Sequence, residues 1–221
     1  MCIRDRNSIQ WMAQMSHQRE ISEFVQRLKK LLSYNLGKEG RQTTLRMELE
    51  IVKEYIALQQ MRYDFIIEMN IEDGSYLDQP TVRMLFQPLV ENAIRYGLGD
   101  DEKISIQVFE DVARHLAVVT ISDSGKGLNQ EEIDEINQPF DYDWGYWKNE
   151  NRGIGLRYVK AMLESFYDGQ TSLFVNSKKG FGTRITILLP VRKPEEKKEK
   201  DKEVTLEENK VGQTDESIDC R

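Results

Sequence analysis

Cysteine and long hydrophobic runs are what this chain of 221 residues has least of. Its only cysteines, Cys2 and Cys220, lie near the two ends, so no disulfide framework is implied and a reducing compartment is expected. No apolar run approaches the roughly 20 residues that a membrane-spanning helix needs. No signal peptide is predicted either, and the chain as read is expected to be soluble.

Positive charge and histidine are also scarce. The 31 Lys and Arg residues are outnumbered by 38 Asp and Glu residues, which gives a net charge of −7. Such an acidic chain is a poor candidate for binding nucleic acid, because phosphate contacts need clustered Lys and Arg. The two histidines, His17 and His115, have no carboxylate or cysteine at metal-ligand spacing, so neither is expected to bind a metal or to take part in catalysis.

The first third of the chain predicts two amphipathic helices joined by a turn. Apolar residues recur at spacings of three and four over residues 7–36 and again over residues 45–63. Gly37 favours a turn between the two helices, and Thr43 or Thr44 can cap the second one. A lone hairpin leaves both apolar stripes uncovered, so we expect the hairpin of a second copy to complete a four-helix bundle. The alternative is packing against the later part of the same chain.

After residue 64, short strands and helices alternate without a regular strand–helix–strand repeat. The predicted strands cover residues 65–71, 103–110, 116–121, 172–175 and 183–189, and the predicted helices cover residues 80–96, 129–136 and 154–166. We therefore expect an α+β fold, a two-layer α/β sandwich with a mixed sheet, preceded by the α-helical hairpin. The end of the chain is nearly all Lys, Glu and Asp, which predicts a charged disordered tail over residues 192–221.

One of the predicted buried strands ends in the sequence Asp123-Ser124-Gly125-Lys126-Gly127. A carboxylate at the end of a strand can accept a hydrogen bond from an amine, and the exocyclic amine of adenine is such a donor. Gly125 and Gly127 would let a flat ligand approach the backbone. The plainer alternative is that Asp123 only begins a turn, since Asp and Gly are common turn residues.

Glu91 and Asn92 lie inside a predicted helix whose apolar residues cover its core face. Asn is a poor residue for a helix interior, because its amide competes for the backbone, so its presence calls for a reason. An amide oxygen that binds Mg²⁺ beside nucleotide phosphates would be one. Glu91 would accept a proton from an attacking group or orient it, and Arg95, one turn on, would reach phosphate. The alternative is an exposed polar face.

Gly153 and Gly155 stand at the start of the helix predicted over residues 154–166. Free N–H groups at a helix N-terminus favour phosphate, and Arg157 adds a cation in the first turn; a flexible loop end is the alternative. Neither a G-x-x-x-x-G-K-[ST] loop nor a G-x-G-x-x-G motif occurs. The preceding loop, residues 137–152, carries five aromatic residues. They suggest a lid that orders over a nucleotide or against a partner, and the alternative is packing into a groove of its own domain.

Taken in order, these motifs resemble the ATP-binding domain of the gyrase, chaperone, histidine kinase and mismatch-repair superfamily, the GHKL or Bergerat fold. The four similar segments are Glu91-Asn92-Ala93 to its N box, Asp123–Gly127 to its G1 box, Gly153-Ile154-Gly155-Leu156 to its G2 box, and Gly182-Thr183 to its last glycine box. The match is closer to the LytS/YesM-type sensor histidine kinases, whose signatures resemble residues 87–97 and 153–159. The resemblance covers about residues 7–190.

The resemblance implies a ligand and a role for each residue of these motifs. The ligand would be ATP with Mg²⁺: Asn92 would hold the Mg²⁺, Asp123 would bind the adenine amine, and Thr183 would support that contact. Glu91 would be the catalytic residue. The other ATP-binding residues would be Arg95, Tyr96, Gly125, Gly127, Gly153, Ile154, Gly155, Leu156, Arg157 and Gly182. The reaction would be phosphoryl transfer from ATP to a histidine, which rests on positioning and charge neutralisation.

The sequence departs from this family ahead of the hairpin. The LytS/YesM branch carries its phosphorylated histidine in a segment whose end Asn7-Ser8-Ile9 resembles, so that histidine would fall just before Met1. Residues 1–6 look like a non-native leader, and residues 7–64 look like a dimerisation hairpin cut short at the phosphoacceptor. Residues 65–191 would be the ATP-binding catalytic domain. We therefore expect the chain to bind Mg-ATP without phosphorylating itself.

The leading hypothesis is the ATP-binding catalytic portion of a two-component sensor histidine kinase. It would form a homodimer through residues 7–64 and serve a response regulator protein. Segments outside this chain would anchor the parent protein in a membrane, with this part on the cytoplasmic face. The alternatives are an ATPase or a protein-serine kinase of the same superfamily, and a non-catalytic dimeric scaffold.

Overall fold

The structure is a computed structural model that describes residues 19–37, 43–99, 103–137 and 154–191. The chain divides into two units, Met1–Pro190 and Val191–Arg221, and every helix and strand described below lies in the first. The predictions for the first 18 residues, for the aromatic-rich loop and for the charged tail fall outside the described residues.

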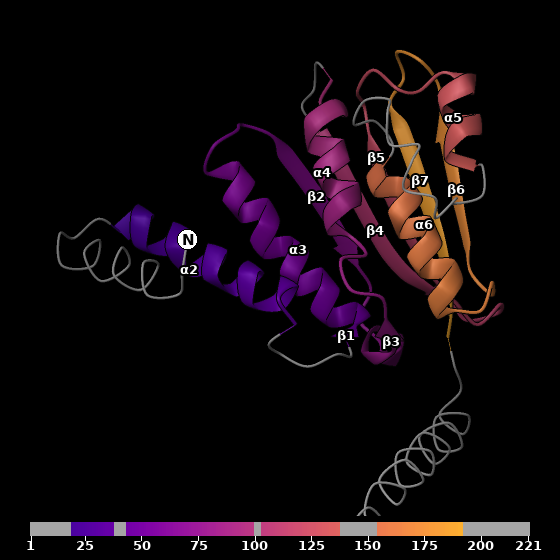
Figure 1. The fold of residues 1–221 in the computed structure, drawn as a ribbon, viewed down its shortest axis with the longest axis horizontal. Helices are drawn as coiled ribbons and strands as arrows, with labels where there is room; N and C mark the ends of the chain where they lie inside the picture. The colour runs from indigo at the N-terminus through magenta and orange to yellow at the C-terminus, as the bar shows by residue number, and fades with distance from the viewer. Residues whose placement is uncertain (1–18, 38–42, 100–102, 138–153, 192–221) are drawn as a thin grey trace, which may run out of the picture. The chain divides into compact units, whose positions relative to one another are not determined.

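A five-stranded mixed sheet forms one layer of the fold (Figure 1). The strand order is β2-β4-β5-β7-β6, in which β2 runs parallel to β4 and all other neighbours are antiparallel. The strands are β2 (Ile66–Ile71), β4 (Lys103–Asp111), β5 (Leu116–Asp123), β6 (Ser172–Ser177) and β7 (Thr183–Pro190).

Helices form the second layer over one face of this sheet (Figure 1). They are α4 (Gln87–Tyr96), α5 (Gln130–Asn137) and α6 (Ile154–Phe166). Alternate residues of the three central strands point toward them and are buried, among them Ile106, Val119 and Ile187. The predicted two-layer α+β sandwich with a mixed sheet is therefore confirmed.

The helix predicted over residues 80–96 begins seven residues later than expected, at Gln87. Pro80 instead belongs to β3 (Pro80–Thr81), which pairs antiparallel with β1 (Thr43–Thr44) and follows a short 3₁₀ helix, η1 (Ser75–Asp78). Met84 has a φ of +58°, a left-handed conformation that no helix continues through. The proline that starts the helix is Pro88, which sits in the first turn, where its missing N–H costs nothing.

The predicted hairpin consists of α2 (Arg19–Asn35) and α3 (Leu45–Gln60). A buried cluster of Leu31, Tyr34, Ile51 and Leu58 joins the two helices. Thr44, one of the two predicted caps, is the N-cap of α3, because its hydroxyl accepts a hydrogen bond from the N–H of Met47 (3.2 Å). No helix in the described part of the chain is both long and apolar enough to cross a membrane.

The second helix of the hairpin is also packed against the later part of the chain. Its buried residues Leu45, Leu49, Val52 and Ile56 follow helical spacing on a different face from the cluster that meets α2, and α3 contacts both α4 and η1. One face of α3 therefore packs against the later part of the same chain, which was the alternative to packing against a second copy. These contacts cross the boundary predicted between residues 64 and 65.

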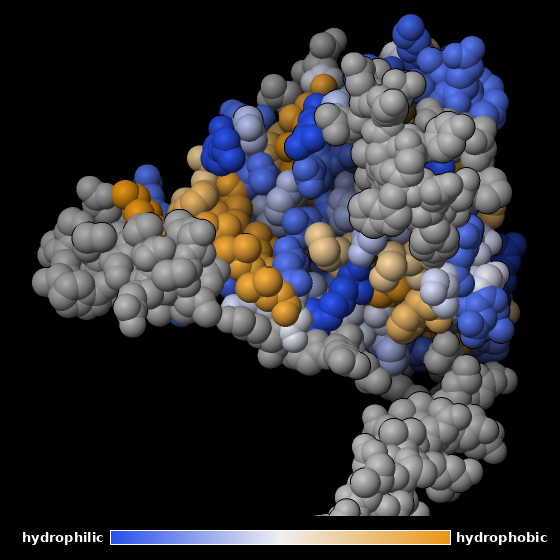
Figure 2. Space-filling view, in the orientation of Figure 1, coloured by the Kyte–Doolittle hydropathy of each residue, from blue (hydrophilic) through white to orange (hydrophobic). Residues whose placement is uncertain are grey.

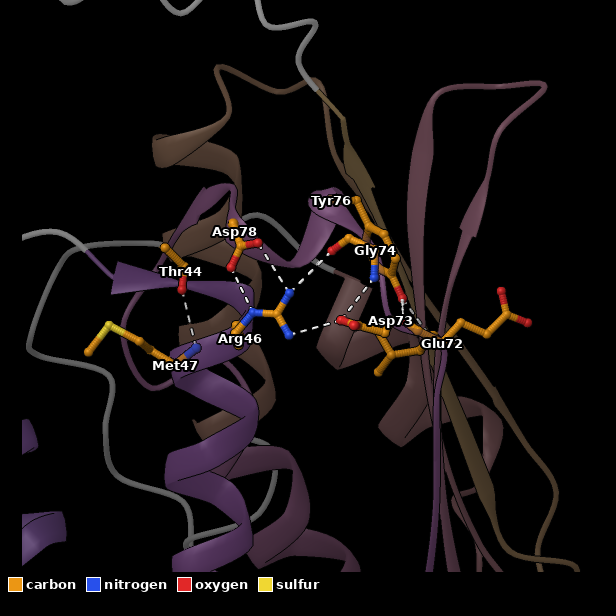
Figure 3. A network of polar contacts seen from close by, with 9 residues as sticks. Thr44, Arg46, Met47, Glu72, Asp73, Gly74, Tyr76 and Asp78 are labelled. Atoms are coloured by element: carbon orange, nitrogen blue, oxygen red, sulfur yellow. Dashed lines mark hydrogen bonds and ion pairs between the residues drawn. The ribbon is translucent and has the colours of Figure 1, made fainter.

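Ion pairs fix the N-terminal end of α3 to the same part of the chain. Arg46 lies between two carboxylates, with distances of 3.0 Å to Asp73 and 2.7 Å to Asp78, and it also donates to the carbonyl oxygen of Gly74 (Figure 3). All three partners lie between β2 and β3 in sequence, so the first turn of α3 is held against the loop that follows the edge strand.

Candidate functional site

A pocket of about 110 Å³ lies where the helices meet the ends of β5 and β7. Its walls come from α4, from β5 and the loop after it, from α5, from the start of α6 and from β7. The lining residues are Leu89, Asn92, Ala93, Tyr96, Gly97, Ile121, Asp123, Lys126, Gly127, Leu128, Glu132, Ile136, Leu156, Arg157, Thr183 and Ile185.

The structure brings residues from all four predicted motifs to this pocket. The predicted site residues that line it are Asn92, Tyr96, Asp123, Gly127, Leu156, Arg157 and Thr183. Five others, Glu91, Arg95, Gly125, Gly155 and Gly182, lie close by in sequence but are not part of the lining. Gly153 and the side chain of Ile154 fall outside the described part of the chain.

Asp123 is the anchored acidic group of the pocket. Its Oδ1 accepts hydrogen bonds from the N–H of Gly125 (3.1 Å) and the N–H of Thr183 (3.0 Å). Burial raises the pKa of this carboxyl group, and the two N–H donors oppose that rise. Among the described residues, Oδ2 makes no hydrogen bond. The turn expected of Asp123 does form, and the carboxylate keeps one oxygen for a ligand.

The glycines around Asp123 allow three backbone segments to meet. A Cβ placed on Gly97 would lie 2.5 Å from Cγ of Asp123, and one on Gly125 would lie 2.4 Å from Cα of Gly97. Gly182, with φ of +84°, would place a Cβ 2.0 Å from the carbonyl oxygen of Asp123. The space beside Gly125 is therefore filled by protein. The expectation that Gly125 lets a flat ligand approach the backbone is therefore wrong. This glycine instead lets two chain segments come together.

Asn92 stands at the point where α4 and α6 approach each other. A Cβ on Gly155 would lie 3.3 Å from Cβ of Pro88 and 3.5 Å from Nδ2 of Asn92, so the first turn of α6 lies beside the amide. Glu91 and Arg95 lie elsewhere on α4: they form an ion pair at 3.0 Å, and their side chains are 44% and 58% exposed. In this structure neither of them lines the pocket.

Sequence reasoning missed several lining residues. The ammonium group of Lys126 lies 5.0 Å from the centre of the Tyr96 ring, in cation–π contact with it. Glu132 is fixed by a reciprocal capping pair with Asn129, in which each side chain accepts from the backbone N–H of the other (2.8 and 2.9 Å). The spacing Asn-x-x-Glu predicts that pair, but nothing in the sequence places it beside a ligand.

The rest of the pocket is apolar. Ile121, Leu128, Ile136, Leu156 and Ile185 line it beside the Asp123 carboxylate. Apolar walls with a few fixed polar groups are typical of small-molecule sites, and a flat heteroaromatic ring with an amine would fit this combination. The described residues contain no group of three His, Cys, Asp or Glu side chains able to hold a metal ion.

Two protein families match the chain, one after the other along its length. The family described as "Histidine kinase-, DNA gyrase B-, and HSP90-like ATPase" matches residues 77–193, which is more than half of the chain. The chain belongs to this ATPase family. A second family, described as "Histidine kinase", matches residues 7–66, ahead of the ATPase match. Together the two matches cover the ATP-binding domain and a histidine kinase segment that precedes it.

Individual relatives point the same way. The chain is 30% identical over 168 residues to the sensor protein kinase HptS of Staphylococcus aureus, in strain bovine RF122 / ET3-1 and in strain USA300. The match covers 76% of this chain and 32% of the relative, so the chain spans about a third of the length of these curated relatives.

The solved structures to which the chain is similar include two histidine kinases. The histidine kinase domain of the blue-light activated histidine kinase from Erythrobacter litoralis EL346 gives a TM-score of 0.47 at 20% identity, covering 77% of this chain and 74% of that chain. The mycobacterial sensor histidine kinase MprB gives a TM-score of 0.47 at 18% identity, covering 69% of this chain and 97% of that chain.

Proposed function

We propose that this chain binds Mg-ATP in the pocket at Asp123 and presents the γ-phosphate for transfer to a histidine, from which it passes to a response regulator protein. The carboxylate of Asp123 carries this proposal. Two backbone N–H groups hold its Oδ1, its Oδ2 is left for a donor, and apolar side chains beside it suit a flat ring. The exocyclic amine of adenine supplies the donor, and the adenine ring supplies the flat apolar body.

The phosphates would lie toward α4 and α6. Arg157 and Lys126 line the pocket and offer positive charge, and the N–H groups at the start of α6 favour an anion. The amide oxygen of Asn92 would hold Mg²⁺ together with phosphate oxygens, because Mg²⁺ takes oxygen ligands and is bound largely through substrate phosphates. Glu91 would orient the attacking histidine from the exposed side of α4.

The surface of the helical hairpin favours a second copy of the chain as a partner. A groove of about 260 Å³ runs between α2 and α3, lined by Phe24, Leu28, Leu31, Leu32, Tyr55 and Leu58 among others. Figure 2 shows the hydrophobic surface gathered where these two helices lie side by side. We propose that a second copy of the chain covers this surface in a homodimer. No charge pattern in the described residues identifies the response regulator.

The experiment is a set of nucleotide titrations with one matched pair of substitutions. Asp123→Asn keeps the Oδ1 acceptor but places an amide NH₂ where the adenine amine would donate. We expect ATP affinity to fall by about 10- to 100-fold, since an unmatched buried polar pair costs about 1–3 kcal/mol. Inosine triphosphate has a carbonyl in place of the amine. The affinity of the variant for this nucleotide should therefore fall less than its affinity for ATP, or should rise. The control is Asp134→Asn, the same chemical change on the exposed side of α5.

A second arm tests the metal. Asn92→Ala should weaken ATP binding in the presence of Mg²⁺ and leave binding in EDTA unchanged, because only the metal contact is lost. Unchanged ATP affinity in Asp123→Asn would exclude the adenine contact. Absence of ATP binding by the unmodified chain would favour the non-catalytic scaffold instead.

A further inference from the structure

A carboxylate outside the pocket is buried in the middle of the fold. Glu48, on α3, is only 2% exposed. By helical spacing it lies between the face of α3 that meets α2 and the face that meets α4 and η1. Charged residues are almost never fully buried without partners, so its surroundings have to satisfy both oxygens.

The partners on one side are backbone N–H groups just ahead of α4. Oε1 accepts from the N–H of Met84 (2.9 Å), and Oε2 accepts from the N–H of Leu85 (2.7 Å). Met84 has positive φ, and successive N–H groups in such a turn form a concave anion-binding site. Phe86, the N-cap residue of α4, makes no side-chain capping bond. Glu48 therefore provides the acceptors that the entry to α4 lacks locally.

The partners on the other side belong to the hairpin. The hydroxyl of Tyr34, in the last turn of α2, donates to Oε1 of Glu48 and lies 2.6 Å from Oγ1 of Thr43. Arg83 closes the arrangement: its guanidinium stacks on the Tyr34 ring at 4.6 Å and donates to the Tyr34 carbonyl oxygen (2.8 Å). The end of α2, the start of α3 and the entry to α4 thus meet at one carboxylate.

The helix that Glu48 holds carries one wall of the pocket. Asn92, Ala93 and Tyr96 of α4 all line the pocket, and the Gly97 that follows packs on Asp123. A shift in the entry to α4 moves these groups together, and displacements of about 1 Å are enough to cost a site much of its function.

We propose that Glu48, with Tyr34 as its hydrogen-bond donor, is a positioning residue of the nucleotide site, which it never touches. It holds residues 84–86, and through them it sets the orientation of α4 and the place of Asn92. This inference rests on the proposed function, because it concerns nucleotide binding in the same pocket. It also means that the end of α2, which carries Tyr34, contributes to nucleotide binding.

The test separates positioning from general stability. Glu48→Gln keeps the size of the side chain but turns one acceptor oxygen into a donor that faces an N–H group, and Tyr34→Phe removes only the hydroxyl. The control variants are Ile51→Val and Leu58→Ala, which weaken the α2–α3 cluster by a smaller and a larger amount and leave Glu48 and residues 84–86 unaltered in sequence. For every variant, the melting temperature and the dissociation constant of Mg-ATP are measured, the latter well below all melting temperatures.

We expect Glu48→Gln to weaken Mg-ATP binding on the order of tenfold, as loss of an outer support costs other sites. Tyr34→Phe should weaken it by a smaller factor, and control variants with an equal fall in melting temperature should bind as the unmodified chain does. Wild-type binding by Glu48→Gln, or equal weakening in the controls, would overturn the inference and leave the proposed function standing. Failure of the unmodified chain to bind would overturn both.

Hydrogen exchange on the unmodified chain provides a second measurement that needs no variant. Coupling between two sites is reciprocal, so nucleotide that needs α4 in place should in turn hold Glu48 against residues 84 and 85. Saturating Mg-ATP should therefore slow exchange of the Met84 and Leu85 amides. Slowed exchange in the pocket with no change at these two amides would also overturn the inference.

Discussion

At the scale of the residue, the site contains a carboxylate whose ionised form is disfavoured by burial. Burial disfavours the ionised form of Asp123 by more than its two N–H donors return, so its folded-state pKa is raised. A group of this kind contributes stability that is complete below its ordinary pKa of about 3.9 and is lost as pH rises through the raised value.

Asp123→Asn should therefore become more stable relative to the unmodified chain as pH rises from about 4 toward neutrality. Asn keeps the Oδ1 acceptor for Gly125 and Thr183 but never ionises, so it avoids the penalty of burial. Urea unfolding of both proteins at a series of pH values measures the difference. A difference that stays constant with pH would contradict the raised pKa of the folded state.

At the scale of the element, α3 belongs to two neighbours at once. It packs on α2 through one face and on the later part of the chain through another, and its first turn is fixed by Thr44, Arg46 and the β1–β3 pairing. The hydroxyl of Thr44 satisfies an N–H group that the helix itself cannot.

Thr44→Ala should lower the free energy of unfolding by about 1 kcal/mol, because the Met47 N–H loses its partner at the start of α3. Thr44→Ser, which keeps the hydroxyl, is the matched control and should remain close to the unmodified chain. Chemical unfolding of the three proteins checks this. Equal loss in both variants would assign the effect to the threonine methyl group instead.

Much at this scale could be predicted from the sequence, because each of the central strands β4, β5 and β7 has one buried face. Alternation along residues 103–110 and 183–189 predicts both strands and their inward residues. The start of α4 could not be predicted from Pro80, because Met84 has a positive φ and its N–H donates to Glu48, a contact between residues far apart in the sequence. Glutamate is common on helix surfaces, so nothing in the sequence marks Glu48 as buried.

The polar and glycine residues of the candidate site could be predicted from the sequence, but its apolar lining residues could not. The order of Asn92, Asp123, Gly155 and Thr183 along the chain predicts that they share a site. The apolar lining residues carry the same pattern as any core residue, so no sequence signal separates Ile121 from the rest of the core. The pairing of Arg95 with Glu91, in contrast, follows from their spacing of four residues on one helix face.

At the scale of the whole molecule, the hairpin carries a partly exposed apolar stripe on α2. Ile21 is 44% exposed and precedes Phe24 and Leu28 on the same stripe of α2. A second copy that covers this stripe would bury apolar area that water otherwise contacts, which is the main driving force for association.

Ile21→Glu should convert a dimer of this chain into a monomer, because it places a charge in the apolar surface between the two copies. Gln26→Glu adds the same charge on the opposite side of α2, where residue 26 is exposed, and should leave the dimer intact. Sedimentation velocity measures both. A monomeric unmodified chain, or equal dissociation in the two variants, would exclude pairing through this stripe.

The meeting of three backbone segments around Asp123 also has a consequence for folding. Asp123 and Thr183 are 60 positions apart, and the contacts of Gly97 and Gly182 with Asp123 are likewise long-range, so the base of the pocket consists of contacts that close late in folding. No local fragment of the chain contains a usable part of it. Nucleotide binding by this chain therefore reports completed folding, because a partly folded chain would not bind the nucleotide.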